Sequence, residues 1–430
     1  LDKMKNLLKI FIILLTFLNI EDSKANTLIE SLNSAYLNNP KLNAERANMR
    51  ASKEEKREAI SEFLPSITIS GYVSEQENTI PGDNTNFEPS EQSLKVEQKI
   101  FQGGAGVAKF LKQKHGQSLG EYKLKKIEQE ILLEAVEAHA DLLLSMKKVN
   151  INLMNVDLLE RQVETDQNRL EKGEINLTDL AQSESSLAGA NAKLIAAKND
   201  LITSKTNFEK IIGKKPSENI KEIKEINLSL PKSLAEAYKI SDLENPDLQI
   251  ALYEYKQSKM DLIIAGSDLS PSATITYKIA EQDDFSATVQ DRTQETVTAT
   301  ASWPIFAGGS NIFNLRKFKE LKNQKELLLE DSKKQTATDV ANAWSNFQSS
   351  RSVLESIRAQ VKAAEIANEG ITLEYESGSS RTTLEVIQSR SIFLDANINL
   401  ATSEKDFLLS QFNLLSSVGR LTAKQLNLKQ

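Results

Sequence analysis

Apolar residues recur every seven positions along two long stretches of the chain, 106–172 and 311–377, and neither stretch contains proline. A strict seven-residue repeat is typical of helices that pack as left-handed coiled coils. Each stretch is therefore predicted to be one helix of roughly 100 Å. The series in the first stretch is Leu142, Val149, Val156, Val163 and Leu170, and its counterpart in the second is Phe347, Leu354, Val361, Asn368 and Tyr375.

A shorter return helix is predicted after each long one, beyond a break at Gly173 or Gly378. Each pair of helices then forms an antiparallel hairpin, at 105–212 in the first half and 310–417 in the second. A further helical stretch, 41–63, is expected to lie end to end with the first return helix. The return-helix series are Leu180, Leu187, Leu194, Leu201 and Phe208, and Val386, Phe393, Leu400, Phe407 and Leu414.

Short segments in which polar and apolar residues alternate predict two β-hairpins, at 66–101 and 272–306. Such alternation gives a strand one apolar and one polar face. The loops of the hairpins are expected at Glu77–Ser90 and Asp283–Gln294. Four strands per chain are predicted, at Ser66–Ser70, Ser93–Glu97, Thr274–Ile279 and Thr296–Thr300.

Each β-hairpin ends in a pair of glycines that precedes a long helix, Gly103–Gly104 in the first half and Gly308–Gly309 in the second. We interpret each pair as a tight strand-to-helix turn. The two pairs are 205 residues apart, and Pro65 and Pro271 are 206 residues apart. Spacing that is kept over half of a chain indicates an internal duplication.

The N-terminus has the pattern of a secretory signal, with a basic start at Met4–Lys9 and an apolar run at Ile10–Leu18. Cleavage is predicted after Ala25. The alternative is a membrane anchor, but the apolar run is well short of the ~20 residues that a spanning helix needs. The predicted organisation is a signal peptide at 1–25, a first repeat at 26–213, a linker at 214–232, a second repeat at 233–419 and a tail at 420–430.

The amino-acid composition argues against several classes of function. The chain has 430 residues, a net charge of -7 and no cysteine, which excludes disulfides and thiolate metal sites. The acidic balance argues against a nucleic-acid partner, because phosphate binding needs a basic face. No His/Asp/Glu group has metal-ligand spacing and no catalytic pattern is present, so no cofactor, metal or enzymatic activity is predicted. His139 aligns with Trp344 across the repeat, which favours a packing role.

Two β-hairpins cannot close a membrane barrel by themselves, because the smallest such barrels have about 8 strands. Exposed sheet edges are not tolerated in lipid. The long amphipathic hairpins also leave apolar seams uncovered in a single chain. Several copies of the chain are therefore predicted to share one barrel.

At this point the chain resembles the TolC family of outer-membrane efflux ducts. The resemblance extends over nearly all of the predicted mature chain, and it rests on the order and spacing of the features in duplicate. These are the Leu-x-x-Ala-Tyr…Asn-Pro starts, the Phe-x-Gly-Gly junctions, the hairpin tips and the four strands. The resemblance implies a mainly α homotrimer with a small β part. Its coiled-coil hairpins would form an α-barrel across the periplasm, and its strands a shared 12-stranded β-barrel in the outer membrane of a Gram-negative bacterium.

The function that the resemblance implies is a passive exit duct for efflux or type I secretion. Its expected partners are a periplasmic adaptor and an inner-membrane pump of the RND or ABC class, together with outer-membrane lipid. The alternative is a periplasmic adaptor or coiled-coil scaffold. Adaptors normally carry one helical hairpin with flanking lipoyl-like domains and lack this duplication. The transported substrate and the energy source of the pump stay open.

The resemblance also places a gate at the helix tips. Glu385 and Gln388 match the two aspartates that ring the family's constriction, so one of the two charges is missing here. Tyr375 and Arg381 match a latching pair of the family, and Thr178 and Asp179 match their partners on the other hairpin. An Arg381–Asp179 bond would then join the two hairpins. The alternative is that these are ordinary solvated charges on coiled-coil faces.

Overall fold

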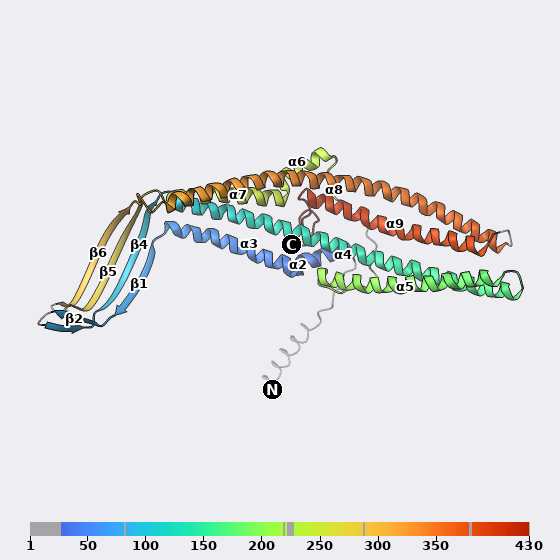
Figure 1. Ribbon diagram of the computed structural model, residues 1–430, viewed down its shortest axis with the longest axis horizontal. Coiled ribbons are helices and arrows are strands. Elements are labelled where there is room, and N and C mark those ends of the chain that lie inside the picture. The colour runs from blue at the N-terminus through green and yellow to red at the C-terminus, as the bar shows by residue number, and fades with distance from the viewer. Residues whose placement is uncertain are drawn as a thin grey trace, which may run out of the picture. The chain divides into compact units, whose positions relative to one another are not determined.

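The computed structural model describes residues 27–80, 83–217, 220–221, 228–286, 289–377 and 381–429. The predicted signal peptide and the expected tip residue Gly378 lie outside them. Figure 1 shows the elements in a ribbon view. The helices are α2 (Leu28–Asn38), α3 (Pro40–Glu58), the short 3-10 helix η1 (Ala59–Phe63), α4 (Ala105–Glu171), α5 (Leu177–Ile212), α6 (Leu234–Glu244), α7 (Pro246–Ser267), α8 (Ser310–Glu376) and α9 (Thr383–Ser417). The strands are β1 (Ser66–Val73), β2 (Gln76–Ile80), β3 (Asp83–Phe87), β4 (Ser90–Gln102), β5 (Ser272–Ser286) and β6 (Val289–Ser302).

These elements divide between two compact units. The sheet unit contains all the strands, α7, most of α3, and the first parts of α4 and α8. The helical unit contains α2, α5, α6, α9 and the remainders of α4 and α8 from Lys125 and Gln335 onward. The mainly α class with a small β part, predicted from the sequence, is confirmed, and both long helices are continuous over 67 residues.

The main sheet has the strand order β1-β4-β5-β6, and every neighbouring pair is antiparallel. It holds the four expected strands. The expected loops are wrong, however, because β2 and β3 form an additional hairpin within 77–90. In the second half, β5 and β6 stay paired through 283–294 as far as Ser286 and Val289. These extensions consist mostly of polar residues such as Gln, Asn, Asp and Thr, so no apolar alternation marks them as strands.

An Asn-Pro pair joins two helices in each half of the chain. Asn39 caps α3, because its side-chain oxygen accepts from the backbone nitrogen of Lys41 at 2.9 Å. Its amide donates to the carbonyl of Ile211 at the end of α5. In the second half, the amide of Asn245 donates to the carbonyl of Ser417 at the end of α9 at 2.8 Å. Since proline fits the first helical position, one Asn-Pro pair starts a helix and holds the end of another.

The glycine pairs provide the backbone conformation that the strand-to-helix turns require. Gly103 and Gly104 have φ of 59° and 89°, and Gly308 and Gly309 have φ of 60° and 83°. Positive φ is strained for residues with a Cβ atom. A side chain at Gly103 would also meet Ser270 of the α7–β5 turn. The two halves therefore turn from sheet to helix in the same way.

Candidate functional site at the helix tips

The return helices α5 and α9 begin with the same capping arrangement. Asn176 and Asp179 form a capping box at the start of α5, and Thr382 and Glu385 form one at the start of α9. The backbone nitrogen of Asn176 donates to the Asp179 carboxylate at 3.2 Å, and that of Thr382 donates to Glu385 at 2.8 Å. Each carboxylate thus satisfies the backbone donor of its N-cap residue, and the N-cap side chain in turn accepts from the backbone nitrogen of Asp179 or Glu385.

Arg381 pairs with residues of its own hairpin. Its Nε donates to the Glu374 carboxylate at 2.6 Å and its Nη1 to Glu385 at 3.0 Å. Hydrogen bonds from the Thr382 backbone, and then from Arg381, hold the pKa of Glu385 below its usual value. Arg381 and Asp179, both within the described residues, are not bonded to each other. The bond expected between the hairpins is absent within this chain.

Tyr375 does reach the other hairpin, but through a different partner. Its side chain is buried, and its hydroxyl donates to the carboxylate of Asp166 on α4 at 2.9 Å. The same hydroxyl lies 3.1 Å from the Thr383 hydroxyl on α9. The guanidinium of Arg169 lies 4.7 Å from the centre of the tyrosine ring, which is a cation–π distance. Burial raises the pKa of Tyr375.

Asp166 is the centre of this network and is fully buried. Besides Tyr375, its carboxylate accepts hydrogen bonds from Ser183 of α5 at 2.5 Å and from Gln162 of α4 at 3.0 Å. A buried carboxylate needs such donors, because an unpaired charge in the interior is very costly. Asp166 therefore joins α4, α5 and α8 directly, and α9 through Tyr375 and Thr383.

The sequence analysis missed Asp166, although a signal for it exists. Asp166 lies seven residues after Leu159, which is buried in the cluster between α4 and α5 with Val156, Ala190 and Leu194. A charged residue that continues a buried seven-residue series needs hydrogen-bond donors nearby, because it is removed from water. Of the predicted tip residues, Tyr375 enters this network, Thr178 and Gln388 are exposed, and Asp179 and Glu385 are held in their caps.

The chain matches the model of the outer membrane efflux protein family over residues 31–214 and 238–420, which together cover most of its length. It belongs to this family. Its function is accordingly that of an outer-membrane exit channel, located in the outer membrane of Gram-negative bacteria, as the sequence predicts. The family covers both repeats, and the adaptor alternative is set aside.

Individual relatives are similar in sequence to this chain over almost its whole length. The outer membrane efflux protein BepC of Brucella suis is 26% identical over 422 residues, covering 96% of this chain and 90% of BepC. The outer membrane protein TolC of Escherichia coli is 22% identical over 417 residues, covering 94% of this chain and 84% of TolC.

Solved structures share the fold. The CmeC outer membrane channel of Campylobacter jejuni superposes with a TM-score of 0.83 at 15% identity, covering 95% of this chain and 91% of CmeC. No helix in the described part of the chain combines the length and apolar character needed to cross a bilayer.

Proposed function

We propose that three copies of this chain assemble head to tail into one passive exit duct, in which their sheets close a shared twelve-stranded barrel. The sheet order supports this, because β1 and β6 are its two edges. Unpaired edges are not tolerated in lipid. Since all neighbouring strands are antiparallel, β6 of one copy can pair with β1 of the next and continue the same alternation.

The exposed side chains of β1 support a lipid-facing surface. Ile67, Ile69 and Val73 alternate along this strand with exposures of 68%, 82% and 78%. On β6, Val297 is exposed by 71%. Large apolar residues in such positions are typical of the outward band of a membrane barrel, and in water they would favour aggregation.

The single observation that supports a gate at the helix tips is the buried Asp166–Tyr375 hydrogen bond between the two hairpins. We propose that this bond keeps the duct closed at rest, and we call it the lock. Separating the two hairpins breaks the buried hydrogen bond from Tyr375 to the Asp166 carboxylate, which contributes about 1.5–3 kcal/mol, while Ser183 and Gln162 stay bonded to Asp166 in the first hairpin. The ion pairs of Arg381 with Glu374 and Glu385 are exposed to solvent, which screens them, so they contribute less than the buried bond. The Asp166 network would therefore dominate the cost of opening.

The partners follow from the family and from the names of relatives. A passive duct needs an energised pump, so we propose a periplasmic adaptor and an inner-membrane pump of the RND or ABC class. The relatives include the alkaline protease secretion protein AprF of Pseudomonas aeruginosa, 20% identical over 436 residues, covering 95% of this chain and 87% of AprF. The name of AprF favours proteins as cargo, and the name of BepC favours efflux.

Conductance of the purified protein in planar bilayers tests the lock. Tyr375→Phe removes the hydroxyl bonds to Asp166 and Thr383 but keeps the ring beside Arg169. We expect a several-fold rise in single-channel conductance or in open time. Arg381→Ser is the matched comparison at the exposed tip and should produce a smaller rise. If only Arg381→Ser opened the channel, the lock would lie at Arg381, and a folded oligomer without any conductance would contradict the duct.

The constriction is proposed to lie at Glu385 and Gln388, one turn apart at the start of α9. Three copies would place three Glu385 carboxylates in one ring, which should bind divalent cations from the periplasmic side. Glu385→Gln removes the charge and keeps a residue that suits the capping box. We expect divalent cations to block the wild-type channel and to lose most of this effect on the variant. Equal block of both proteins would remove Glu385 from the constriction.

A further inference from the structure

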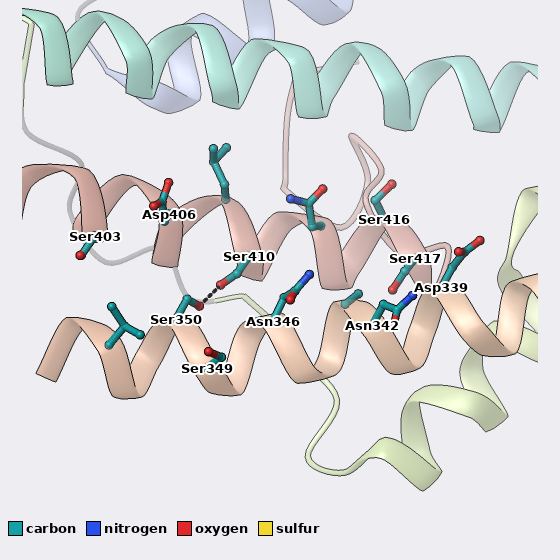
Figure 2. A pocket seen from close by; sticks show the side chains of 14 residues that line it. Asp339, Asn342, Asn346, Ser349, Ser350, Ser403, Asp406, Ser410, Ser416 and Ser417 are labelled. Atoms are coloured by element: carbon teal, nitrogen blue, oxygen red, sulfur yellow. Dashed lines mark hydrogen bonds between the residues drawn. The ribbon is translucent and has the colours of Figure 1, made fainter. Parts of the chain in front are cut away.

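The two helical hairpins are joined in the same way along their middle parts. The Ser145 and Ser204 hydroxyls lie 2.8 Å apart in the α4–α5 hairpin, and those of Ser350 and Ser410 lie 2.8 Å apart in the α8–α9 hairpin. Figure 2 shows the second pair in the α8–α9 groove, which has a volume of about 790 Å³ and is lined mainly by serine, asparagine and aspartate side chains of both helices. The two hairpins are thus tied alike at this level.

Nearer the tips, the matched serines of the two return helices have different partners. Ser183 of α5 donates to the buried Asp166 carboxylate at 2.5 Å. Its counterpart on α9, Ser389, shares its single hydroxyl hydrogen between Oδ1 of Asn368 at 3.3 Å and the carbonyl oxygen of Val386 at 3.1 Å. A hydrogen bond to a carboxylate is stronger than one between neutral groups. The second hairpin is therefore tied more weakly at this level.

Asn368 also interrupts the apolar seam of the second hairpin. It follows Leu354 and Val361 in the seven-residue series of α8, whereas its counterpart on α4 is Val163. A polar residue at a core position of a coiled coil lowers the stability of the packing. The seam between α8 and α9 is thus weakened at this position, while the matching position of α4 stays apolar.

Gly370 and Thr372, which lie within about one turn of Asn368, weaken α8 itself. Gly370 lies inside α8, six residues before its end. A Cβ atom added to Gly370 would have no neighbour within 4 Å in the described part of the chain, so packing within the chain does not require a glycine there. Glycine disfavours a helix interior. The Thr372 hydroxyl oxygen is buried without a hydrogen-bond partner among the described residues, which also costs free energy.

We propose that Gly370 is the hinge of the gate, so that the end of α8 bends there when the lock opens and moves Tyr375 away from Asp166. The proposal rests on the proposed lock and specifies the backbone position that moves. Gly370 lies five residues before Tyr375. The bend therefore falls between the lock and the part of the hairpin that the Ser350–Ser410 pair holds together.

A bend at this position costs the chain little. In the bent helix, water can reach Asn368 and Thr372 and hydrogen-bond side chains that have weak partners or none in the straight helix. Glycine also adopts a wider range of backbone angles than any other residue. The same bend in α4 would pull the Asp166 carboxylate away from Ser183, so the matched part of the first hairpin resists bending.

The substitution Gly370→Ala tests the hinge, because alanine favours the straight helix and its methyl group has room. It is made in the full-length oligomer that carries Tyr375→Phe, in which the lock is broken, and single-channel recordings in planar bilayers give the open probability. We expect this probability to fall about two- to fivefold. Gly189→Ala on α5 is the matched control, because Gly189 also lies inside a helix with no described neighbour within 4 Å of an added Cβ. It should leave the open probability unchanged.

Hydrogen exchange of the backbone amides measures the hinge without any channel recording. In the wild-type oligomer, the amides of 369–374 should be about tenfold less protected than the matched amides of 164–169 on α4, after correction for intrinsic exchange rates. Gly370→Ala should restore much of this protection. Asn368→Val introduces the residue found at the matched position of α4 and should act in the same direction, because it restores the apolar seam.

The outcomes separate the hinge from the lock. Equal protection of 369–374 and 164–169, or an open probability that Gly370→Ala does not change, would overturn the hinge and leave the lock standing. If Tyr375→Phe itself failed to open the channel, the lock would be wrong, and the exchange measurement would still decide whether α8 bends at Gly370. A Gly370→Ala oligomer that opened more often or dissociated would show that this glycine serves close packing between copies, which also contradicts the hinge.

Discussion

The two halves of the chain repeat the same local structure but bury different faces. Within each hairpin the contacts agree, as in the 2.8 Å hydroxyl pairs Ser145–Ser204 and Ser350–Ser410. Between the hairpins they differ, because α4 is covered by α9 while the matching face of α8 is exposed. The positions that are alike in both halves therefore pack within each hairpin. The positions that differ between the halves lie on faces that are covered by the other hairpin in one half and exposed in the other.

The difference between the halves distinguishes residues that stabilise the fold of one chain from residues that contact another copy. A position whose partner lies in the same chain must satisfy the stability of that chain by itself. A position whose partner lies in a second copy is exposed to water until the copies assemble. This exposure favours the small and polar residues found on α8. The comparison predicts that exchanging matched residues between the halves has unequal effects.

The largest expected effect comes from exchanging Leu144 with its counterpart. Leu144→Ser places a hydroxyl and a cavity in the buried face of α4, which should lower the free energy of unfolding by about 3–5 kcal/mol. Ser349→Leu adds an apolar side chain on an exposed face and should leave the unassembled chain almost unchanged. Thermal unfolding, followed by circular dichroism on the detergent-solubilised protein, measures both.

The assembly state provides the control for this pair. Ser349→Leu should weaken oligomers by crowding the α8–α9 groove, even though the chain itself stays folded. Equal destabilisation of the chain by both substitutions would show that the two halves bury the same face. It would then remove the difference on which the comparison rests.

Much of the fold could be predicted from the sequence, because a coiled coil shows a strict seven-residue repeat of apolar positions. The series from Leu142 to Leu170 marked α4 over its last turns, and the glycine pairs marked the ends of β4 and β6. The hairpin β2–β3 could not be found in this way. It consists mostly of polar residues, and its two large apolar residues, Ile80 and Phe87, do not form an alternating pattern that predicts strands.

The tip site was predictable only in part. The resemblance implies that Tyr375 and Arg381 bond to Thr178 and Asp179, two residues of the opposite hairpin near its turn. In the structure, Tyr375 is bonded to Asp166, which lies more than one helical turn before the end of α4. Sequence spacing fixes which face a residue occupies, but it does not fix how far one hairpin is shifted along another.

The smallest effect concerns His139, whose counterpart in the second half is Trp344. His139 is fully buried, its Nδ1 lies 2.9 Å from the Ser31 hydroxyl of α2, and its ring packs near Phe208. Its Nε2 has no hydrogen-bond partner. Trp344 packs against Phe347 and the cluster of Ala237 and Val340, and its indole ring does not titrate in this pH range. The same position is thus sensitive to acid in one half and insensitive in the other.

Burial lowers the pKa of His139 to about 4. The unfolded chain, with a pKa of about 6.5 for histidine, therefore binds more protons between these two values. Stability is fully present above pH 6.5 and falls as the pH drops toward 4, by about 2 kcal/mol at pH 5. His139→Phe should be less stable at pH 7.5, because Ser31 loses its partner, but it should lose less on acidification than the wild type. If both proteins lost the same amount between pH 7.5 and 5, His139 would not be the group that titrates, and the acid sensitivity would not distinguish the two halves.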